Sequence, residues 1–160
     1  NAALTGHLVF STLHTNDAAG AITRLLDMGV EPFLVVSSVR GVIAQRLVRV
    51  ICPHCKKEYV PEPYSNERLY LGISENEPIT LWKGEGCARC NFTGYMGRMS
   101  IHEVLPMKEE MKAMIMNGEA DNLIFEAGRK FGTTSMKEDG IEKVMQGKTT
   151  VSELLRVAYV

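Results

Sequence analysis

The sequence lacks any long apolar run and any excess of charge of one sign. No stretch approaches the roughly 20 apolar residues that a helix needs to span a bilayer, and no secretory signal stands at its start. The 18 basic and 19 acidic side chains nearly cancel, so the chain has no general attraction to nucleic acid or to an anionic membrane. We therefore expect a protein of a reducing, cytoplasmic compartment with no transmembrane segment.

A chain of 160 residues, 45% of them hydrophobic, is long enough to bury a core as one domain or as one domain with an appendage. It begins at Asn1 instead of Met, and an apolar run at residues 8–10 follows almost at once. A strand that is buried on both faces needs neighbours on both sides. We therefore expect the chain to be the C-terminal piece of a larger protein whose upstream part supplies partner strands.

All four cysteines lie in two Cys-x-x-Cys pairs, Cys52 with Cys55 and Cys87 with Cys90. Two intervening residues let both thiolates of one turn point at the same ion, and two such turns form the tetrahedral sulfur set that zinc prefers. Residues 56–86 separate the pairs, a longer segment than in the usual zinc ribbon, which predicts a small looped-out subdomain. Four thiolates leave no open position for water, so we expect a structural zinc ion.

Two disulfides, four free thiols or a redox Cys-x-x-Cys centre are the alternatives for the same cysteines. Cytosolic cysteines are rarely kept oxidised, and two pairs without a thioredoxin-like context do not favour redox chemistry. His54 lies inside the first pair and is a further candidate ligand, but four cysteines already complete a zinc shell. Zinc is therefore the favoured interpretation.

The pattern before the cysteines predicts a strand and two helices. Residues 7–13 are expected to form a buried strand, and Asn16 or Asp17 to cap the helix that follows. A second helix is expected to start at Pro32 and to run to about Gln45. Its inward residues are expected to be Val36, Val39 and Ile43.

From residue 47 on, the pattern predicts strands beside the cysteines and helices after them. A β-branched run at 47–51 leads into the first pair, the proline-rich stretch 52–90 is expected to be irregular, and 99–105 to form another strand. The remainder is expected to be helical, with a capping box at 150–153. One apolar stripe of this part consists of Met107, Met111, Met114 and Ile115.

An ordered set of motifs covers essentially the whole chain. The first, Thr5-Gly6-His7-Leu8-Val9-x-Ser11-Thr12-Leu13-His14-Thr15-Asn16, places a histidine at each end of the expected strand. The others follow in order as residues 21–25, 27–33, 44–49, 94–98 and 101–103. With these motifs the chain resembles the secretion and pilus-assembly ATPases, the hexameric family that drives type II secretion and type IV pilus extension. The four cysteines resemble the zinc-binding arm of its secretion and extension members, which the retraction members generally lack.

The resemblance implies an α/β fold, the C-terminal part of a RecA-like ATPase domain with a tetracysteine zinc-binding insert and a C-terminal helical bundle. Residues 1–51 would belong to the RecA-like core and residues 52–90 to the zinc-binding arm. Residues 91–105 would return to the core as a strand, and residues 106–160 would form the helical subdomain. The family also implies a homo-hexamer at the cytoplasmic face of the bacterial inner membrane that acts on a membrane platform protein.

The resemblance further implies a set of nucleotide contacts. His14 would sense the γ-phosphate with support from His7, which agrees with a motif at a strand's carboxyl end and before a helix N-terminus. Arg98 would lie near the base or sugar, and Arg24 and Arg46 match further positions of the family. A solvated turn explains Arg98 about equally well, and surface or interface ion pairs explain Arg24 and Arg46.

The family's phosphate-binding loop, aspartate box and Walker B acidic residue would all lie before Asn1. Gly147-Lys148-Thr149 resembles the end of a phosphate-binding loop, but Glu142 stands where the first glycine is required and no strand is expected before it. We therefore expect the longer protein to bind ATP with Mg²⁺ and to hydrolyse ATP. This chain by itself is expected to bind zinc without hydrolysing ATP.

Two other functions are compatible with the same sequence. A free-standing zinc-ribbon adaptor would bind protein or nucleic acid. However, the segment between Cys55 and Cys87 holds four basic and six acidic residues, and a nucleic-acid-binding ribbon should be basic. A redox-regulated module would form disulfides in place of the metal site. The expected partners therefore include no nucleic acid.

Overall fold

The computed structural model describes residues 2–158, and these divide into two compact units. The first unit takes the described residues up to Gln45 together with His102–Met136. The second takes Arg46–Ile101 together with the described residues from Lys137 on. Each unit is therefore built from two segments that are distant in the sequence.

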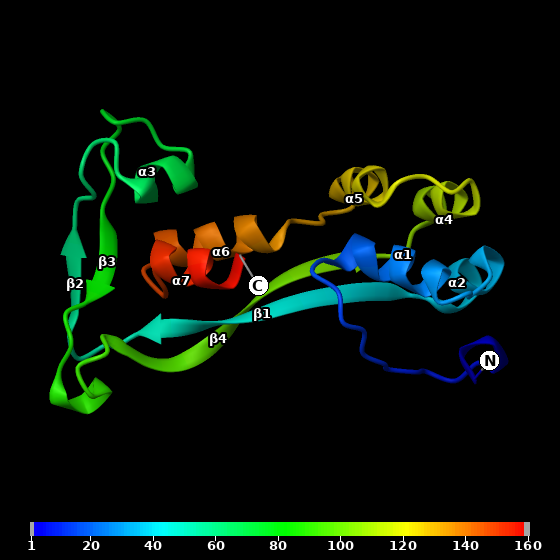
Figure 1. The fold of residues 1–160 in the computed structure, drawn as a ribbon, viewed down its shortest axis with the longest axis horizontal. Helices are drawn as coiled ribbons and strands as arrows, with labels where there is room; N and C mark the ends of the chain where they lie inside the picture. The colour runs from blue at the N-terminus through cyan, green and yellow to red at the C-terminus, as the bar shows by residue number, and fades with distance from the viewer. Residues whose placement is uncertain (1, 159–160) are drawn as a thin grey trace. The chain divides into compact units, whose positions relative to one another are not determined.

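Two long strands pair with each other to form a two-stranded sheet (Figure 1). They are β1, Gly41–Ile51, and β4, Tyr95–Pro106, and each contributes residues to both units. β4 confirms the strand expected over 99–105 and extends it at both ends, and β1 includes the β-branched run 47–51. None of the helices in the described part of the chain is long and apolar enough to cross a membrane.

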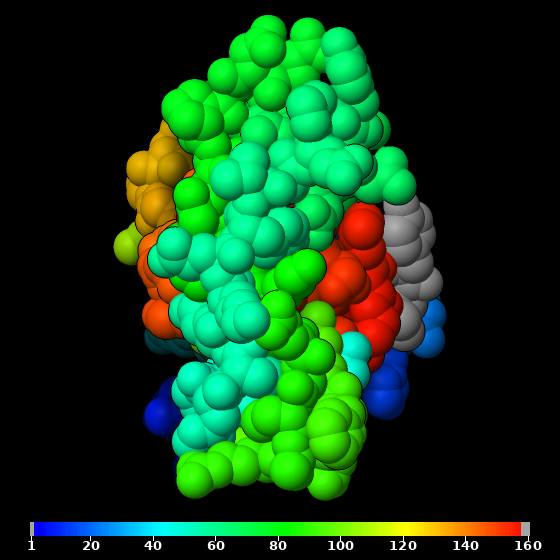
Figure 2. Space-filling model, turned by 90° about the vertical axis from the view of Figure 1, so that its left-hand side faces the viewer, coloured from blue at the N-terminus to red at the C-terminus, as the bar shows by residue number. Residues whose placement is uncertain are grey.

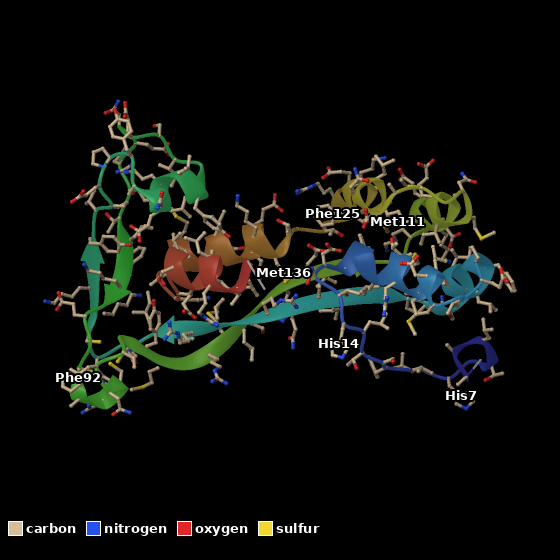
Figure 3. The ribbon with its side chains drawn as sticks, viewed as in Figure 1. His7, His14, Phe92, Met111, Phe125 and Met136 are labelled. Atoms are coloured by element: carbon tan, nitrogen blue, oxygen red, sulfur yellow. The ribbon has the colours of Figure 1, made fainter. Side chains whose placement is uncertain are left out.

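The helices of the first unit pack around one apolar core. They are α1 (Ala18–Asp27), α2 (Pro32–Ser38), α4 (Glu109–Met116) and α5 (Asp121–Arg129), preceded by the 3₁₀ turn η1 (Ala2–Thr5). Asp17 caps α1, since its carboxylate accepts a hydrogen bond of 2.7 Å from the amide of Gly20, and this confirms one of the two predicted caps. The predicted apolar stripe is confirmed as well, because Met107, Met111 and Ile115 are buried in this core and Met114 packs against it. Figure 3 labels Met111 on α4.

A buried carboxylate joins β4 to the start of α1 in this unit. The side chain of Glu103 accepts a hydrogen bond of 2.7 Å from the amide of Ala18, one of the amides that a helix leaves without a partner. Burial raises the pKa of Glu103, and the hydrogen bond from Ala18 opposes this shift. The first turn of α1 is therefore held in place by β4 as well as by its own cap.

The strand predicted over residues 7–13 is wrong for this structure. Residues 7–15 adopt neither helix nor strand, and the side chains of Leu8 and Phe10 are 78% and 89% exposed. A strand is stable only beside a neighbour that satisfies its amides and carbonyls. Among residues 2–158 no strand pairs with this segment, and its apolar pattern therefore finds no sheet to enter.

The second helix is shorter than predicted, because α2 ends at Ser38 and β1 begins at Gly41. The β-branched residues after Gly41 favour a strand once a partner is present, and β4 supplies one. The amide of Met107 donates a hydrogen bond of 3.0 Å to the carbonyl of Arg40, at the end of the paired strands β1 and β4. Ile43, expected to point inward from a helix, is 67% exposed on the strand.

The stretch predicted to be irregular, 52–90, contains regular structure in the second unit. Strands β2 (Lys56–Tyr59) and β3 (Leu81–Gly84) pair antiparallel, with Lys56 opposite Gly84 and Tyr59 opposite Leu81. Between them lies α3 (Asn66–Leu71), capped by Ser65, and the turn η2 (Ala88–Cys90) follows β3. Hydrophobic patterning misses these elements because the strands have only four residues each and the helix only six.

The interior of the arm, residues 52–90, is organised around a buried arginine. The guanidinium of Arg68 donates hydrogen bonds to the carbonyls of Pro61, Ser74 and Glu77 at 2.8–3.1 Å. These contacts connect α3 to the loops on both sides of it.

The second unit is completed by α6 (Met136–Met145) and α7 (Val151–Ala158), which confirm the predicted helical remainder. Figure 2 shows the arm in cyan to green at the surface, with α7 in red beside it.

Replacing Leu105 with alanine should destabilise the first unit strongly. Leu105 is fully buried, and its truncation leaves a cavity that the packed helices cannot fill. We expect Leu105→Ala to lower the free energy of unfolding by about 2–5 kcal/mol in urea denaturation followed by circular dichroism. Val104→Ala, at the exposed neighbour, should cost less than about 1 kcal/mol. Equal losses in the two variants would contradict the placement of Leu105 in the core.

Candidate metal centre

The four cysteine sulfurs form one cluster in the second unit. All four Sγ atoms lie within 4.8 Å of one another. The separations are 3.9 Å between Cys52 and Cys87, 3.9 Å between Cys55 and Cys90, and 3.8 Å between Cys87 and Cys90. A tetrahedral zinc ion with bonds of about 2.3 Å to sulfur sets its ligands about 3.8 Å apart. The cluster therefore has the size of a four-thiolate zinc site.

Two tight turns bring the sulfurs to this point. The amide of Cys55 donates to the carbonyl of Cys52 at 3.3 Å, and the amide of Cys90 donates to the carbonyl of Cys87 at 3.1 Å. Each turn places the two sulfurs of a Cys-x-x-Cys pair on the same side of the backbone. The β2–β3 hairpin joins the turns, since the amide of Glu85 donates to the carbonyl of Cys55 at 3.1 Å.

Backbone amides point at the sulfurs and favour the thiolate form. Gly86 donates to the Sγ of Cys55 at 3.3 Å, and Cys87 and Gly94 donate to the Sγ of Cys90 at 3.2 and 3.3 Å. Burial alone would raise the pKa of Cys90, but the two amides, together with hydrogen bonds to the side chains of Cys87 and Cys55, lower it to about 6. Burial and the neighbouring thiols raise the pKa of Cys55 to about 12, against the amide of Gly86. The cluster therefore holds negative charge most easily at Cys90, and a cation would stabilise the other thiolates.

The donor set fits zinc better than the alternatives weighed from the sequence. Four sulfur ligands in a tetrahedral arrangement select zinc over the oxygen-seeking Mg²⁺ and Ca²⁺. All four cysteines are free, and sulfurs 3.8 Å apart are far from the roughly 2.05 Å of a disulfide. His54 lies outside the cluster, and its ring faces the guanidinium of Arg89 at 3.3 Å.

The structure places the predicted nucleotide-binding residues on two different units. His7 and His14 lie on the exposed segment of the first unit, where the Oγ1 of Thr5 is 3.1 Å from Nδ1 of His7 (Figure 3). Arg24 lies on an exposed face of α1 in the same unit. Arg46 is half-buried on β1 and Arg98 is exposed on β4, both in the second unit. Their roles remain predictions.

Arg98 lines an open hollow in the surface of the second unit. The hollow has a volume of about 560 Å³, and its other lining residues are Arg49, Thr93, Tyr95 and Gly97. The guanidinium carbon of Arg49 lies 4.2 Å from the centroid of the Tyr95 ring, within the range of a cation–π contact. Arg49 and Arg98 therefore border the same hollow, and the guanidinium of Arg49 is also paired with Glu153.

A buried glutamate holds Arg49 in this position. The carboxylate of Glu153 accepts hydrogen bonds from the amide of Arg49 at 2.8 Å, from its guanidinium at 2.6 Å and from Arg156 at 2.9 Å. Glu153 is only 1% exposed, and burial by itself would raise its pKa; the hydrogen bonds from Arg156 and Arg49 instead lower it to about 2. The predicted capping box is thus only half formed, since Thr150 accepts from the amide of Glu153 while the glutamate side chain turns to Arg49.

The sequence did not reveal the contacts among Arg49, Tyr95 and Glu153. Arg49 and Tyr95 stand in motifs of the resembled family, but no spacing connects them to Glu153, which lies 104 residues beyond Arg49. The one available signal was the acidic residue Glu153 in the last helical segment. Its capping role accounts for only one of its hydrogen-bond partners.

Comparison with known proteins gives the family to which this chain belongs. A family profile described as "Type II/IV secretion system protein" matches residues 1–156. The chain belongs to this family.

Several curated relatives are similar over nearly the whole chain. It is 51% identical over 154 residues to the type IV pilus assembly ATPase PilB of Thermus thermophilus, covering 96% of this chain and 17% of that protein. It is 47% identical over 156 residues to the type II secretion system ATPase E of Vibrio cholerae, covering 98% of this chain and 30% of that protein. The type II secretion system protein E of Pseudomonas aeruginosa is 49% identical over 156 residues, with the same coverage. The chain thus spans less than a third of the length of these relatives.

The low pKa of Glu153 predicts how acid acts on the second unit. A carboxyl whose pKa falls from 4.5 to about 2 on folding stabilises the fold fully above about pH 4.5, and this contribution is lost as the pH falls toward 2. Glu153→Gln should therefore lower the free energy of unfolding at pH 7 by on the order of 2 kcal/mol and flatten its decrease between pH 5 and pH 2.

The measurement is urea denaturation at a series of pH values. Glu62→Gln, at an exposed carboxylate of the same unit, is the control and should leave the profile unchanged. An unaltered acid limb in Glu153→Gln would contradict the assignment.

Proposed function

We propose that this chain forms part of a hexameric motor ATPase that powers type II protein secretion or type IV pilus assembly. The match to the family over residues 1–156 carries the proposal, together with relatives named as ATPases of both machines. The four-sulfur cluster supports it, since it corresponds to the zinc-binding arm expected for the secretion and assembly members.

The proposed domain organisation follows the order of the sequence. Residues 1–51 belong to a RecA-like core, 52–90 to the zinc arm, 91–105 to a strand that returns to the core, and 106–160 to a helical subdomain. Cys52, Cys55, Cys87 and Cys90 hold one structural zinc ion. The ion supplies the folding free energy that a polar arm of this size cannot obtain from burial alone.

In the longer protein, ATP with Mg²⁺ is bound mainly by residues outside this chain. His14 senses the γ-phosphate with support from His7, and Arg98, Arg24 and Arg46 contact the nucleotide. The exposed Arg98 at the hollow of the second unit supports an anion-binding role for this residue. Hydrolysis moves domains of the hexamer against one another at the cytoplasmic face of the inner membrane, and this motion acts on a platform protein.

Zinc content tests the metal assignment directly. The purified chain should contain about one zinc ion by elemental analysis, since four thiolates complete one tetrahedral shell. Cys52→Ser and Cys90→Ser should each lower zinc affinity by about 100-fold or more, because each removes one of the four ligands. His54→Ala should retain wild-type zinc, because His54 faces Arg89 and not the cluster. Equal zinc loss in His54→Ala, or no zinc in the wild type, would overturn the assignment.

ATP turnover tests the enzymatic part of the proposal. The 160-residue chain alone should show no hydrolysis above background, whereas the longer protein that contains it should hydrolyse ATP. In the longer protein, His14→Ala should lower kcat by roughly tenfold or more, because a group that contacts the γ-phosphate stabilises the transition state. His54→Ala is the matched control and should retain kcat. Hydrolysis by the chain alone would contradict the proposed location of the phosphate-binding loop.

A further inference from the structure

The segment Gly147-Lys148-Thr149, which resembles the end of a phosphate-binding loop, makes an unrelated set of contacts in the second unit. It forms the turn between α6 and α7. The carbonyl of Lys148 accepts a hydrogen bond of 2.9 Å from the amide of Ile51, and the hydroxyl of Thr149 donates one of 2.8 Å to the carbonyl of Arg49. Thr149 is completely buried, so no ligand reaches its hydroxyl. The 147–149 turn therefore binds the end of β1.

The same end of β1 is held by further groups and leads directly into the metal centre. Glu153 of α7 accepts from the amide of Arg49 at 2.8 Å. The amide of Cys52, the next residue after the strand, donates to the carbonyl of Gly94 at 2.9 Å. Cys52 is fully buried. The backbone that presents the first sulfur is thus continuous with the backbone that α6 and α7 hold.

A second contact runs from the 147–149 turn to the β2–β3 hairpin. Gly147 has a φ of +66°, and a Cβ at this position would lie 2.7 Å from Cδ2 of Trp82 and 2.7 Å from Nζ of Lys56. Lys56 is the residue after Cys55 and lies over the Trp82 ring, with its Nζ 5.2 Å from the ring centroid. α3 also packs against α7. The turn therefore touches the chain just after the second sulfur as well as just before the first.

We propose that the 147–149 turn joins the metal centre and the C-terminal helices into one cooperative unit, so that loss of zinc opens α6 and α7 although these helices supply no ligand. The inference rests on the zinc site proposed above. An ion that fixes Cys52 and Cys55 fixes the end of β1, which the turn binds, and the start of β2 at Lys56, whose side chain the turn contacts. Segments that share buried contacts of this kind unfold together. Glu153 belongs to the same unit, so zinc also maintains the position of Arg49 at the hollow that it shares with Arg98.

Hydrogen–deuterium exchange of the 160-residue chain, with zinc and after chelation, tests this coupling. We expect chelation to lower the protection of amides in residues 151–157 by about tenfold or more, in step with residues 49–58. Amides of α5, in the other unit, should change by less than about twofold and serve as the internal reference.

Substitutions in the turn separate coupling from metal binding. Thr149→Val removes the hydroxyl that donates to Arg49 and should reduce the zinc-dependent protection of residues 151–157 by about fivefold, with zinc content unchanged. Thr149→Ser keeps the hydroxyl and should restore the coupling. If Thr149→Val opens residues 49–58 and 151–157 together while α5 keeps its protection and Thr149→Ser resembles the wild type, the proposal is supported. Equal effects of Thr149→Val and Thr149→Ser would contradict it.

Gly147→Ala has a matched control in Gly72→Ala, in the same unit. Both glycines have positive φ, +66° and +70°, but a Cβ at Gly72 meets nothing within 4 Å. Both variants therefore carry similar backbone strain, and only Gly147→Ala displaces the turn from Trp82. Gly147→Ala should lower the protection of residues 49–58 and 151–157 together, whereas Gly72→Ala should leave both near wild-type values.

The outcomes distinguish this inference from the proposed function. If the chain binds one zinc and chelation exposes residues 52–94 but not 151–157, the coupling is refuted and the zinc site stands. If the chain binds no zinc, the zinc assignment fails and the coupling fails with it.

Discussion

Four cysteine sulfurs within 4.8 Å of one another are the constraint on which the second unit depends. The arm between them contains two four-residue strands and one six-residue helix, too little regular structure to bury a core of its own. The zinc ion proposed for this site would close the loop from residue 52 to residue 90 and contribute its binding free energy to folding. The hairpin, the capped helix and the buried Arg68 then complete the arm with local hydrogen bonds that a free loop would not maintain.

A second constraint is electrostatic and joins the last helix to the strand that precedes the first sulfur. Burying the carboxylate of Glu153 costs free energy, and hydrogen bonds from Arg49 and Arg156 compensate this cost. The arrangement orders Arg49 over the ring of Tyr95, at the edge of the hollow that Arg98 also lines. The metal centre, the strand end and the C-terminal helix are thereby neighbours in one network within this unit.

Local pattern predicted much of the fold where an element's stability is local. Asp17 before α1, Pro32 at the start of α2, the run in β4 and the apolar stripe of α4 all appear as expected. Two of the errors share one cause. Residues 7–13 and 41–45 carry β-branched or apolar residues whose conformation depends on a partner strand, which is present for 41–45 and absent among the described residues for 7–13. The short elements of the arm were missed because no periodicity develops over four to six residues.

The sequence alone identified the four cysteines as one candidate ligand set and the family of the chain, because ligand spacing and ordered motifs can be recognised along the chain without its fold. Only the tertiary structure decided what Glu153 and the 147–149 turn do. Their partners, Arg49 and Ile51, lie about 100 residues away in the chain. The packing of whole elements determines which donor binds a given buried carboxylate or carbonyl, and no local sequence pattern indicates the pairing.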